Sequence, residues 1–113
     1  MNKRIKKLWI KALRSGEYKQ ARGCLRTKSD HCCLGVLTDI YRKATHEGRW
    51  RNLGTGMAFV VGDETEEVML ADTVVKWAAL KETNPRLGQH RASVLNDSGK
   101  DFNYIADKID KYL

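Results

Sequence analysis

The 113-residue sequence has one proline and three cysteines, and no apolar run approaches the roughly 20 residues that crossing a bilayer takes. The first apolar stretch after the basic N-terminus is interrupted by Lys11 and Arg14, which argues against a secretory signal. Linkers, internal repeats and low-complexity tracts are absent as well. We therefore expect a single domain over residues 1–113, located in the cytoplasm and without a membrane partner.

Known catalytic signatures are also missing, since the chain has no Gly-x-Ser-x-Gly, no Walker loop and no His-Glu-x-x-His. Cys32 and Cys33 are neighbours, and a disulfide between neighbours is strained, so we expect reduced thiols. Together with Cys24 and His31 they are four potential metal ligands, but their spacing is not that of a zinc site. A nucleophilic cysteine would need His31 as its base. We favour structural burial and predict no catalysis, no metal and no cofactor.

Positive charge is concentrated in the first 30 residues, which hold ten lysines and arginines against two acidic residues, a net charge of +8. The other 83 residues hold eleven against twelve, a net charge of −1. The formal charge of +7 therefore arises in the N-terminal part, where it creates a local positive field. This field indicates an anionic partner.

Four segments carry apolar residues at helical spacing and are predicted to be helices. They are residues 2–14, 31–43, 73–80 and the segment that follows Gly99. For the second helix we expect a cap at Ser29 or Asp30, and for the last one a capping box that begins at Ser98. Gly35 lies inside the second helix, where a glycine is unfavourable. We therefore expect another part of the backbone, in the first helix, to approach it closely.

Two β-rich runs at residues 57–61 and 66–70 flank a turn at 62–65 and predict a β-hairpin. Residues 45–55 are polar and are predicted to form a loop. The fold class that follows is α+β, a small single domain with three to four helices packed on a short antiparallel hairpin or sheet.

The residues between the first two helices form the basic loop (residues 18–28), which combines cations with an amide and an aromatic ring. Arginine and lysine bind phosphate, and the glutamine amide both donates to and accepts from a base edge. A tyrosine ring can stack on a base. A solvated surface loop is the alternative interpretation. The candidate residues are Tyr18, Lys19, Gln20, Arg22, Arg26 and Lys28.

Short polar side chains also precede the last predicted helix, in the segment 96–99. A helix N-terminus with such side chains can bind a phosphate or a hydroxyl group, although simple capping is the alternative. Asp97 could accept from a ribose hydroxyl or a base amine. Trp50, between Arg49 and Arg51, is the tryptophan that either packs in the interior or contacts a partner.

Four separated segments resemble, in order, a widespread group of small and mostly uncharacterised phage and prophage proteins. The segments are LWIKALRSGEYKQARGCLR, HCCLGVLTDIY, VVKWAAL and LNDSGKDFNYIADKID. The resemblance covers nearly the whole chain, and it implies an accessory phage protein in the cytoplasm of an infected bacterial host. Such proteins commonly block host enzymes, manage nucleic acid or counter host defence. One class that fits is the sponge, which sequesters cyclic nucleotides or ADP-ribose-type signals without hydrolysing them.

We therefore expect a homo-oligomer that binds a small anionic nucleotide between the basic loop and the start of the last helix. The expected roles are phosphate binding by Lys19, Arg22 and Arg26, base recognition by Gln20 and Asn96, stacking by Tyr18, and a hydroxyl or amine contact by Asp97.

Two other functions stay open. The basic N-terminal part could bind DNA or RNA, in which case the affinity would fall steeply with salt. Alternatively, the protein could dock on a host protein and inhibit it, with Trp50 and its flanking arginines as the hot spot.

Overall fold

The computed structural model describes residues 1–113 and confirms the α+β fold class. The helices are α1 (Lys3–Arg14), α2 (Cys33–Thr45), α3 (Asp72–Trp77), α4 (Ala92–Asp97) and α5 (Phe102–Tyr112). The strands are β1 (Arg49–Asn52), β2 (Met57–Val61), β3 (Glu64–Glu66), β4 (Arg86–Leu87) and β5 (His90–Arg91). None of the helices has the length and apolar composition that crossing a membrane takes.

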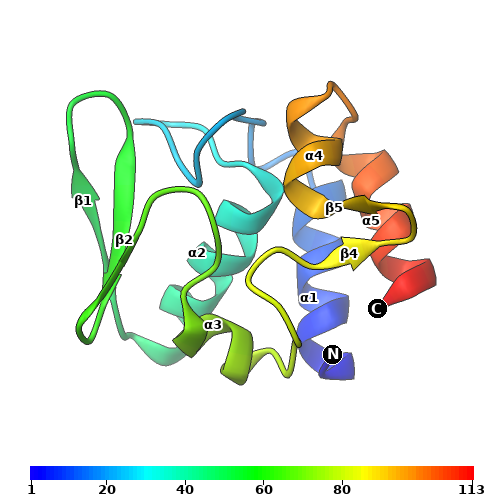
Figure 1. Ribbon diagram of the computed structural model, residues 1–113, viewed down its shortest axis with the longest axis horizontal. Helices are drawn as coiled ribbons and strands as arrows, with labels where there is room; N and C mark the ends of the chain where they lie inside the picture. Colours follow the sequence, from blue (N-terminus) through cyan, green and yellow to red (C-terminus); the bar gives the residue numbers. More distant parts are fainter.

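Helix α2 lies in the middle of the molecule (Figure 1), and its residues 33–39 and Tyr41 are buried. The antiparallel sheet β1–β2–β3 lies on one side of α2, and helices α1 and α5 lie on the other (Figure 1). The chain between α1 and α2 crosses from one side to the other, over the N-terminal end of α2 (Figure 1). This segment contains the basic loop, so the fold places the candidate residues where the two halves meet.

The core forms where the apolar faces of α1, α2 and α5 meet, as their periodicity predicts. Trp9 of α1 is fully buried, and its indole N–H donates to the Cys33 carbonyl oxygen at 2.9 Å. This bond satisfies a polar group that would otherwise be costly to bury. On the sheet side, the ring of Tyr41 from α2 lies edge-on to Phe59 of β2, with 6.1 Å between the centroids. Side chains of α2 thus join the two halves.

The prediction of a polar loop at residues 45–55 was wrong, because residues 49–52 form the edge strand β1. Trp50 pairs with Phe59 across the sheet, and their ring centroids are 5.2 Å apart on the inner face. Arg49 and Arg51 alternate with Trp50 and are exposed. The predicted hairpin exists, but its second strand is residues 64–66 rather than 66–70.

The start of the last helix was also predicted wrongly. Asp101 caps α5 and accepts from the backbone N–H of Tyr104 at 2.8 Å, whereas Ser98 ends the short helix α4. Similarly, α2 is capped by Cys32 and not by Ser29 or Asp30. A close backbone approach to Gly35 does exist, but it comes from the basic loop. A Cβ atom there would lie 1.8 Å from the carbonyl oxygen of Leu25.

Candidate ligand-binding site at the basic loop

Short backbone pairings hold the basic loop in place on both sides of His31. On one side, the His31 N–H donates to the Lys19 carbonyl oxygen, and the Ala21 N–H donates to that of His31, each at 2.9 Å. On the other side, Arg26 pairs with His31 and also extends the sheet by pairing with Met57. The loop is therefore ordered by its own chain and needs no ligand to form.

The side chain of Asn96 in α4 anchors this loop and is 0% exposed. Its amide group donates to the Ala21 carbonyl oxygen at 2.8 Å and to Asp97 Oδ1 at 3.0 Å. Its oxygen accepts from the Cys33 backbone N–H at 3.1 Å and from Gln20 Nε2 at 2.9 Å. All the hydrogen-bonding capacity of this amide is used within the protein.

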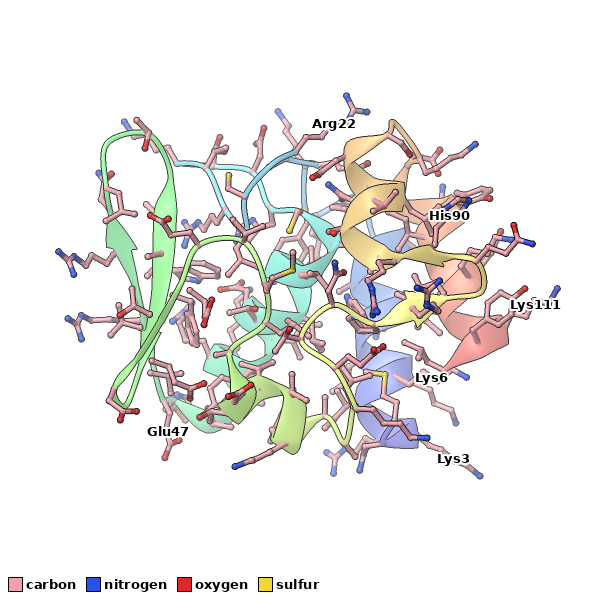
Figure 2. All side chains as sticks on the ribbon, in the orientation of Figure 1. Lys3, Lys6, Arg22, Glu47, His90 and Lys111 are labelled. Atoms are coloured by element: carbon pink, nitrogen blue, oxygen red, sulfur yellow. The ribbon has the colours of Figure 1, made fainter.

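Asp97 and Arg22 belong to the same junction between the loop and α4. Asp97 Oδ1 accepts from the Gly23 backbone N–H at 3.0 Å. Arg22 Nε donates to the Asn96 carbonyl oxygen at 3.4 Å, while the side chain extends outward from the top of the molecule (Figure 2). Asn96 and Asp97 thus position the loop, and the outer part of the Arg22 guanidinium remains available to an anion.

A second group of polar side chains gathers around the carboxylate of Asp39 in α2. Its Oδ2 accepts from the Tyr18 hydroxyl at 2.8 Å and lies 3.3 Å from Lys43 Nζ. Its Oδ1 accepts from Trp50 Nε1 at 3.1 Å and from Arg42 Nε at 3.3 Å. Burial raises the pKa of Asp39, but these donors and the lysine charge outweigh it and hold the pKa at about 2. Asp39 is therefore ionised.

His31 lies beside this carboxylate with both ring nitrogens buried and without a hydrogen-bond partner. Its ring lies edge-on to Tyr18 and Trp50, with centroids 5.0 and 5.8 Å away. Burial lowers the pKa of His31 to about 4, although the charge of Asp39 opposes this shift. The imidazole is therefore neutral at pH 7. The guanidinium of Arg26 lies 5.3 Å from the centre of the Trp50 ring, and its Nε also lacks a partner.

A hollow of about 270 Å³ also borders Tyr18, between the basic loop and the start of α5. Tyr18 and Gln20 line it from the loop, and residues 101–103 line it from α5. The end of α1 closes the third side. This is the place where we expected a ligand, although the residues of the segment 96–99 do not line it.

The seven predicted site residues therefore divide among several environments. Tyr18 and Gln20 line the hollow, Arg26 stacks on Trp50, and Lys19 is exposed. Arg22, Asn96 and Asp97 lie together at the junction with α4. The sequence reasoning missed Asp39 and Lys43 around Tyr18. Both lie on a helix as ordinary-looking charged residues, and only the tertiary structure brings Tyr18 to them.

The three thiols are not activated. Burial raises the pKa of all three cysteines, to about 11 in the case of Cys32. They are therefore protonated at neutral pH, whereas a cysteine nucleophile needs the thiolate. No group of three or more His, Cys, Asp and Glu side chains is placed to hold a metal ion.

A family model described as a domain of unknown function (DUF8296) matches residues 1–113. The chain belongs to the DUF8296 family. Comparisons with curated proteins and with solved structures give no significant match. Membership in DUF8296 brings no activity with it, so a function has to be argued from the basic loop and the hollow beside it.

Proposed function

We propose that this protein binds a small anionic nucleotide in the hollow between the basic loop and the start of α5, and releases it chemically unchanged. The observation that carries the proposal is the hollow itself, because it has an aromatic wall, Tyr18, and an amide wall, Gln20, both from the basic loop. A cyclic oligonucleotide or an ADP-ribose-type molecule has the matching parts, namely bases that stack and phosphates that carry charge.

The groups free to contact a ligand follow from the hydrogen bonds already made. Gln20 Nε2 donates to Asn96 Oδ1 and to the Lys100 carbonyl oxygen, so the Gln20 Oε1 atom remains free to accept from a base N–H. The Tyr18 hydroxyl is held by Asp39 and Lys43, which fixes the ring for stacking. Asp101, which also lines the hollow, accepts from the Tyr104 N–H as a helix cap.

The phosphates would meet cations that no carboxylate neutralises. Lys19, Arg22 and Arg26 of the basic loop form no salt bridge, since the ion pairs of the protein involve other residues. Lys43 Nζ, 3.1 Å from the Tyr18 hydroxyl, is paired with Asp39 and does not add to this free charge. The charged residues that line the hollow itself are Asp101 and Arg14, which is paired with Asp107, so the attraction of an anion depends on the free cations of the basic loop.

Binding without catalysis is supported by the state of the reactive groups. The cysteine thiols are protonated, and the neutral imidazole of His31 has no side chain within hydrogen-bond distance with which to exchange a proton. The resemblance to small phage proteins supplies a context for the proposal. The protein would act in the cytoplasm of an infected bacterium, as a homo-oligomer that withholds a nucleotide signal from host defence.

A thermal-shift screen tests the proposal, with ADP-ribose, cyclic di-AMP, mononucleotides and a short DNA duplex as probes at two salt concentrations. A ligand of the native state raises the melting temperature with the logarithm of its excess over Kd. We expect one small nucleotide to produce a large shift and to be recovered intact after heating. Degraded nucleotide would contradict the absence of catalysis, and a shift by the duplex alone would favour the nucleic-acid alternative.

Substitutions at Tyr18 locate the binding site. Tyr18→Leu should weaken binding by about tenfold or more, because base stacking on an aromatic ring contributes roughly 1–3 kcal/mol. Tyr18→Phe keeps the stacking face and should bind within about threefold of the wild type. Leu8→Ala, at an exposed position of α1 outside the hollow, is the control. Equal binding by wild type and Tyr18→Leu would refute the site.

A further inference from the structure

The exposed face of α5 carries tyrosines and lysines in alternation. Lys100 lies 4.8 Å from the ring centre of Tyr104, and Lys108 lies 5.3 Å from the same ring. Tyr112, two turns further along, has Lys108 at 5.9 Å and Lys111 at 5.2 Å. Tyr104, Lys108 and Tyr112 are four apart in α5 and share one face. Lys111, and Lys100 just before the helix, place their ammonium groups near the same two rings. We call these five residues the Lys–Tyr face.

Both rings of the Lys–Tyr face are open to solvent, with Tyr104 37% and Tyr112 44% exposed. Tyr112 lies against the turn between β4 and β5, where Gly88 makes room for it. A Cβ atom on Gly88 would come within 2.9 Å of Tyr112 Cζ, and the positive φ of +84° also favours glycine. The turn thus supports the outer tyrosine in a fixed position.

Tyr112 also lines two hollows, of about 350 and 260 Å³. The larger hollow includes Lys81 and Arg86 in its lining, and the smaller one includes His90 and Lys108. The larger hollow contains the one acidic residue that lines either hollow, Glu82, and this residue is paired with Arg91 at 2.9 Å. Each hollow therefore offers an aromatic wall and an unneutralised cation.

The two acidic residues of α5 differ in their contacts with α1: Asp107, which borders this face four residues before Lys111, uses its carboxylate, whereas Asp110 uses its backbone. Asp107 pairs with Arg14 at 2.7 Å, and Lys6 Nζ donates to the Asp110 carbonyl oxygen at 3.0 Å. Lys6 and Lys111 extend from the same side of the molecule, and Glu47 lies on the opposite side (Figure 2). The Lys–Tyr face therefore carries three lysines, and the carboxylate at its border is paired with Arg14.

We propose that the Lys–Tyr face and the two hollows beside Tyr112 bind single-stranded nucleic acid. Proteins that bind single strands without sequence preference combine cations that follow the backbone with aromatic rings on which bases stack. The rings of Tyr104 and Tyr112 are about 12 Å apart along the helix axis, given the rise of an α-helix, which leaves space for a separate base on each. A duplex keeps its bases stacked on each other, so it could use only the charges.

This second site is joined to the proposed nucleotide site through the Lys100 carbonyl oxygen, which accepts from Gln20, but Tyr104, Lys108, Lys111 and Tyr112 do not line the nucleotide site. The two proposals can therefore fail independently. Binding at the Lys–Tyr face also differs from non-specific attraction of nucleic acid by the net positive charge, because that attraction would act through any exposed lysine. The experiment has to separate these two sources of binding.

Fluorescence anisotropy with a labelled oligothymidylate of about 12 nucleotides provides the test, in a length range typical of single-strand sites. The double variant Lys108→Glu/Lys111→Glu should weaken binding by about tenfold at low salt. The matched control is Lys7→Glu/Lys11→Glu on α1, which makes the same charge change on another helix and should cost less than about threefold. An equal loss in both variants would overturn the proposal in favour of net charge.

The aromatic part of the proposal has its own readout. Tyr104→Leu/Tyr112→Leu should reduce oligothymidylate binding by about tenfold while leaving duplex binding unchanged, and Tyr104→Phe/Tyr112→Phe should restore it. Melting temperatures of all variants establish that they are folded. Loss of binding in the phenylalanine variant, or tighter binding of a duplex than of the single strand, would refute stacking. No binding of the wild type at low salt would refute the site altogether.

Discussion

Two buried polar side chains on either side of the basic loop, Asn96 and His31, have opposite environments. Asn96 is 0% exposed, and its amide makes four hydrogen bonds, to the loop, α2 and its own helix. His31 is 7% exposed, and neither of its ring nitrogens has a partner. The first residue is thus a structural anchor, whereas the second is buried at a cost that its own contacts do not offset.

The difference teaches how a buried polar group should be interpreted. A buried group with all its hydrogen bonds made stabilises the fold. Its removal leaves each of its partners buried without a hydrogen bond. A group without partners stabilises nothing through hydrogen bonds, and its presence calls for another explanation. Here His31 lies behind Tyr18, the aromatic wall of the proposed site, and helps to hold that ring edge-on.

Replacing Asn96 should have the largest effect. Asn96→Leu leaves the Cys33 N–H and the Ala21 carbonyl oxygen without partners, and we expect it to lower the free energy of unfolding by about 3–4 kcal/mol. Urea denaturation measures this change. Asn103→Leu, at an exposed position of α5, is the control and should change stability by less than about 0.5 kcal/mol. A loss below about 1 kcal/mol for Asn96→Leu would contradict its role as the anchor.

Acidification should have an intermediate effect through His31. Its pKa is about 4 in the folded protein, below the ordinary value of 6.5, so the unfolded state binds more protons between these values. Stability should therefore fall by about 2 kcal/mol as the pH drops from 6.5 to 4. The contribution of Asp39, whose pKa is about 2, is lost only at lower pH, below its ordinary 3.8.

Denaturation curves of the wild type and His31→Leu between pH 7 and 4 isolate this contribution, because the other titrating groups are common to both. Asp30, Asp39, Arg26 and Lys43 all act on His31, so the proton is taken up in a field of mixed sign. The wild type should lose more stability than the variant over this range. Parallel curves would show that His31 is not buried in a neutral state.

At neutral pH the replacement of His31 should have the smallest effect. Leucine has no polar atoms to bury, so His31→Leu should leave the free energy of unfolding within about 1 kcal/mol of the wild type. Comparing the free energies of unfolding of His31→Leu and Asn96→Leu at the same pH tests most directly the difference between a buried group without partners and a fully bonded one. A loss of more than about 2 kcal/mol would mean that the imidazole makes a hydrogen bond, for instance to a buried water molecule.

The main helices could be predicted from the sequence because each presents a long apolar stripe. Ile5, Trp9 and Leu13 mark α1, and Phe102, Ile105 and Ile109 mark α5. Strand β1 was missed, since its arginines face solvent and only Trp50 signals burial. Helix α4 was missed because its buried residues are Ala92, Leu95 and the polar Asn96, which do not form an apolar stripe.

The candidate site could be predicted only in part, for a related reason. The composition of the basic loop indicated Tyr18 and Gln20, and both line the hollow at the start of α5. Asn96 was selected as a ligand-binding side chain, but its burial and full hydrogen bonding depend on how α4 packs against the loop. The ionised carboxylate of Asp39 acquires its partners from three separate segments, which local patterns cannot reveal.

The most direct test of nucleotide binding beside Tyr18 is an NMR titration of the ¹⁵N-labelled protein with ADP-ribose and, separately, with cyclic di-AMP. We expect one of these probes to shift the amide signals of Tyr18, Gln20 and Asn103, while those of β1 and β2 stay in place. Shifts confined to the Lys–Tyr face, or saturating amounts of both probes without any shift, would contradict a nucleotide site at the basic loop.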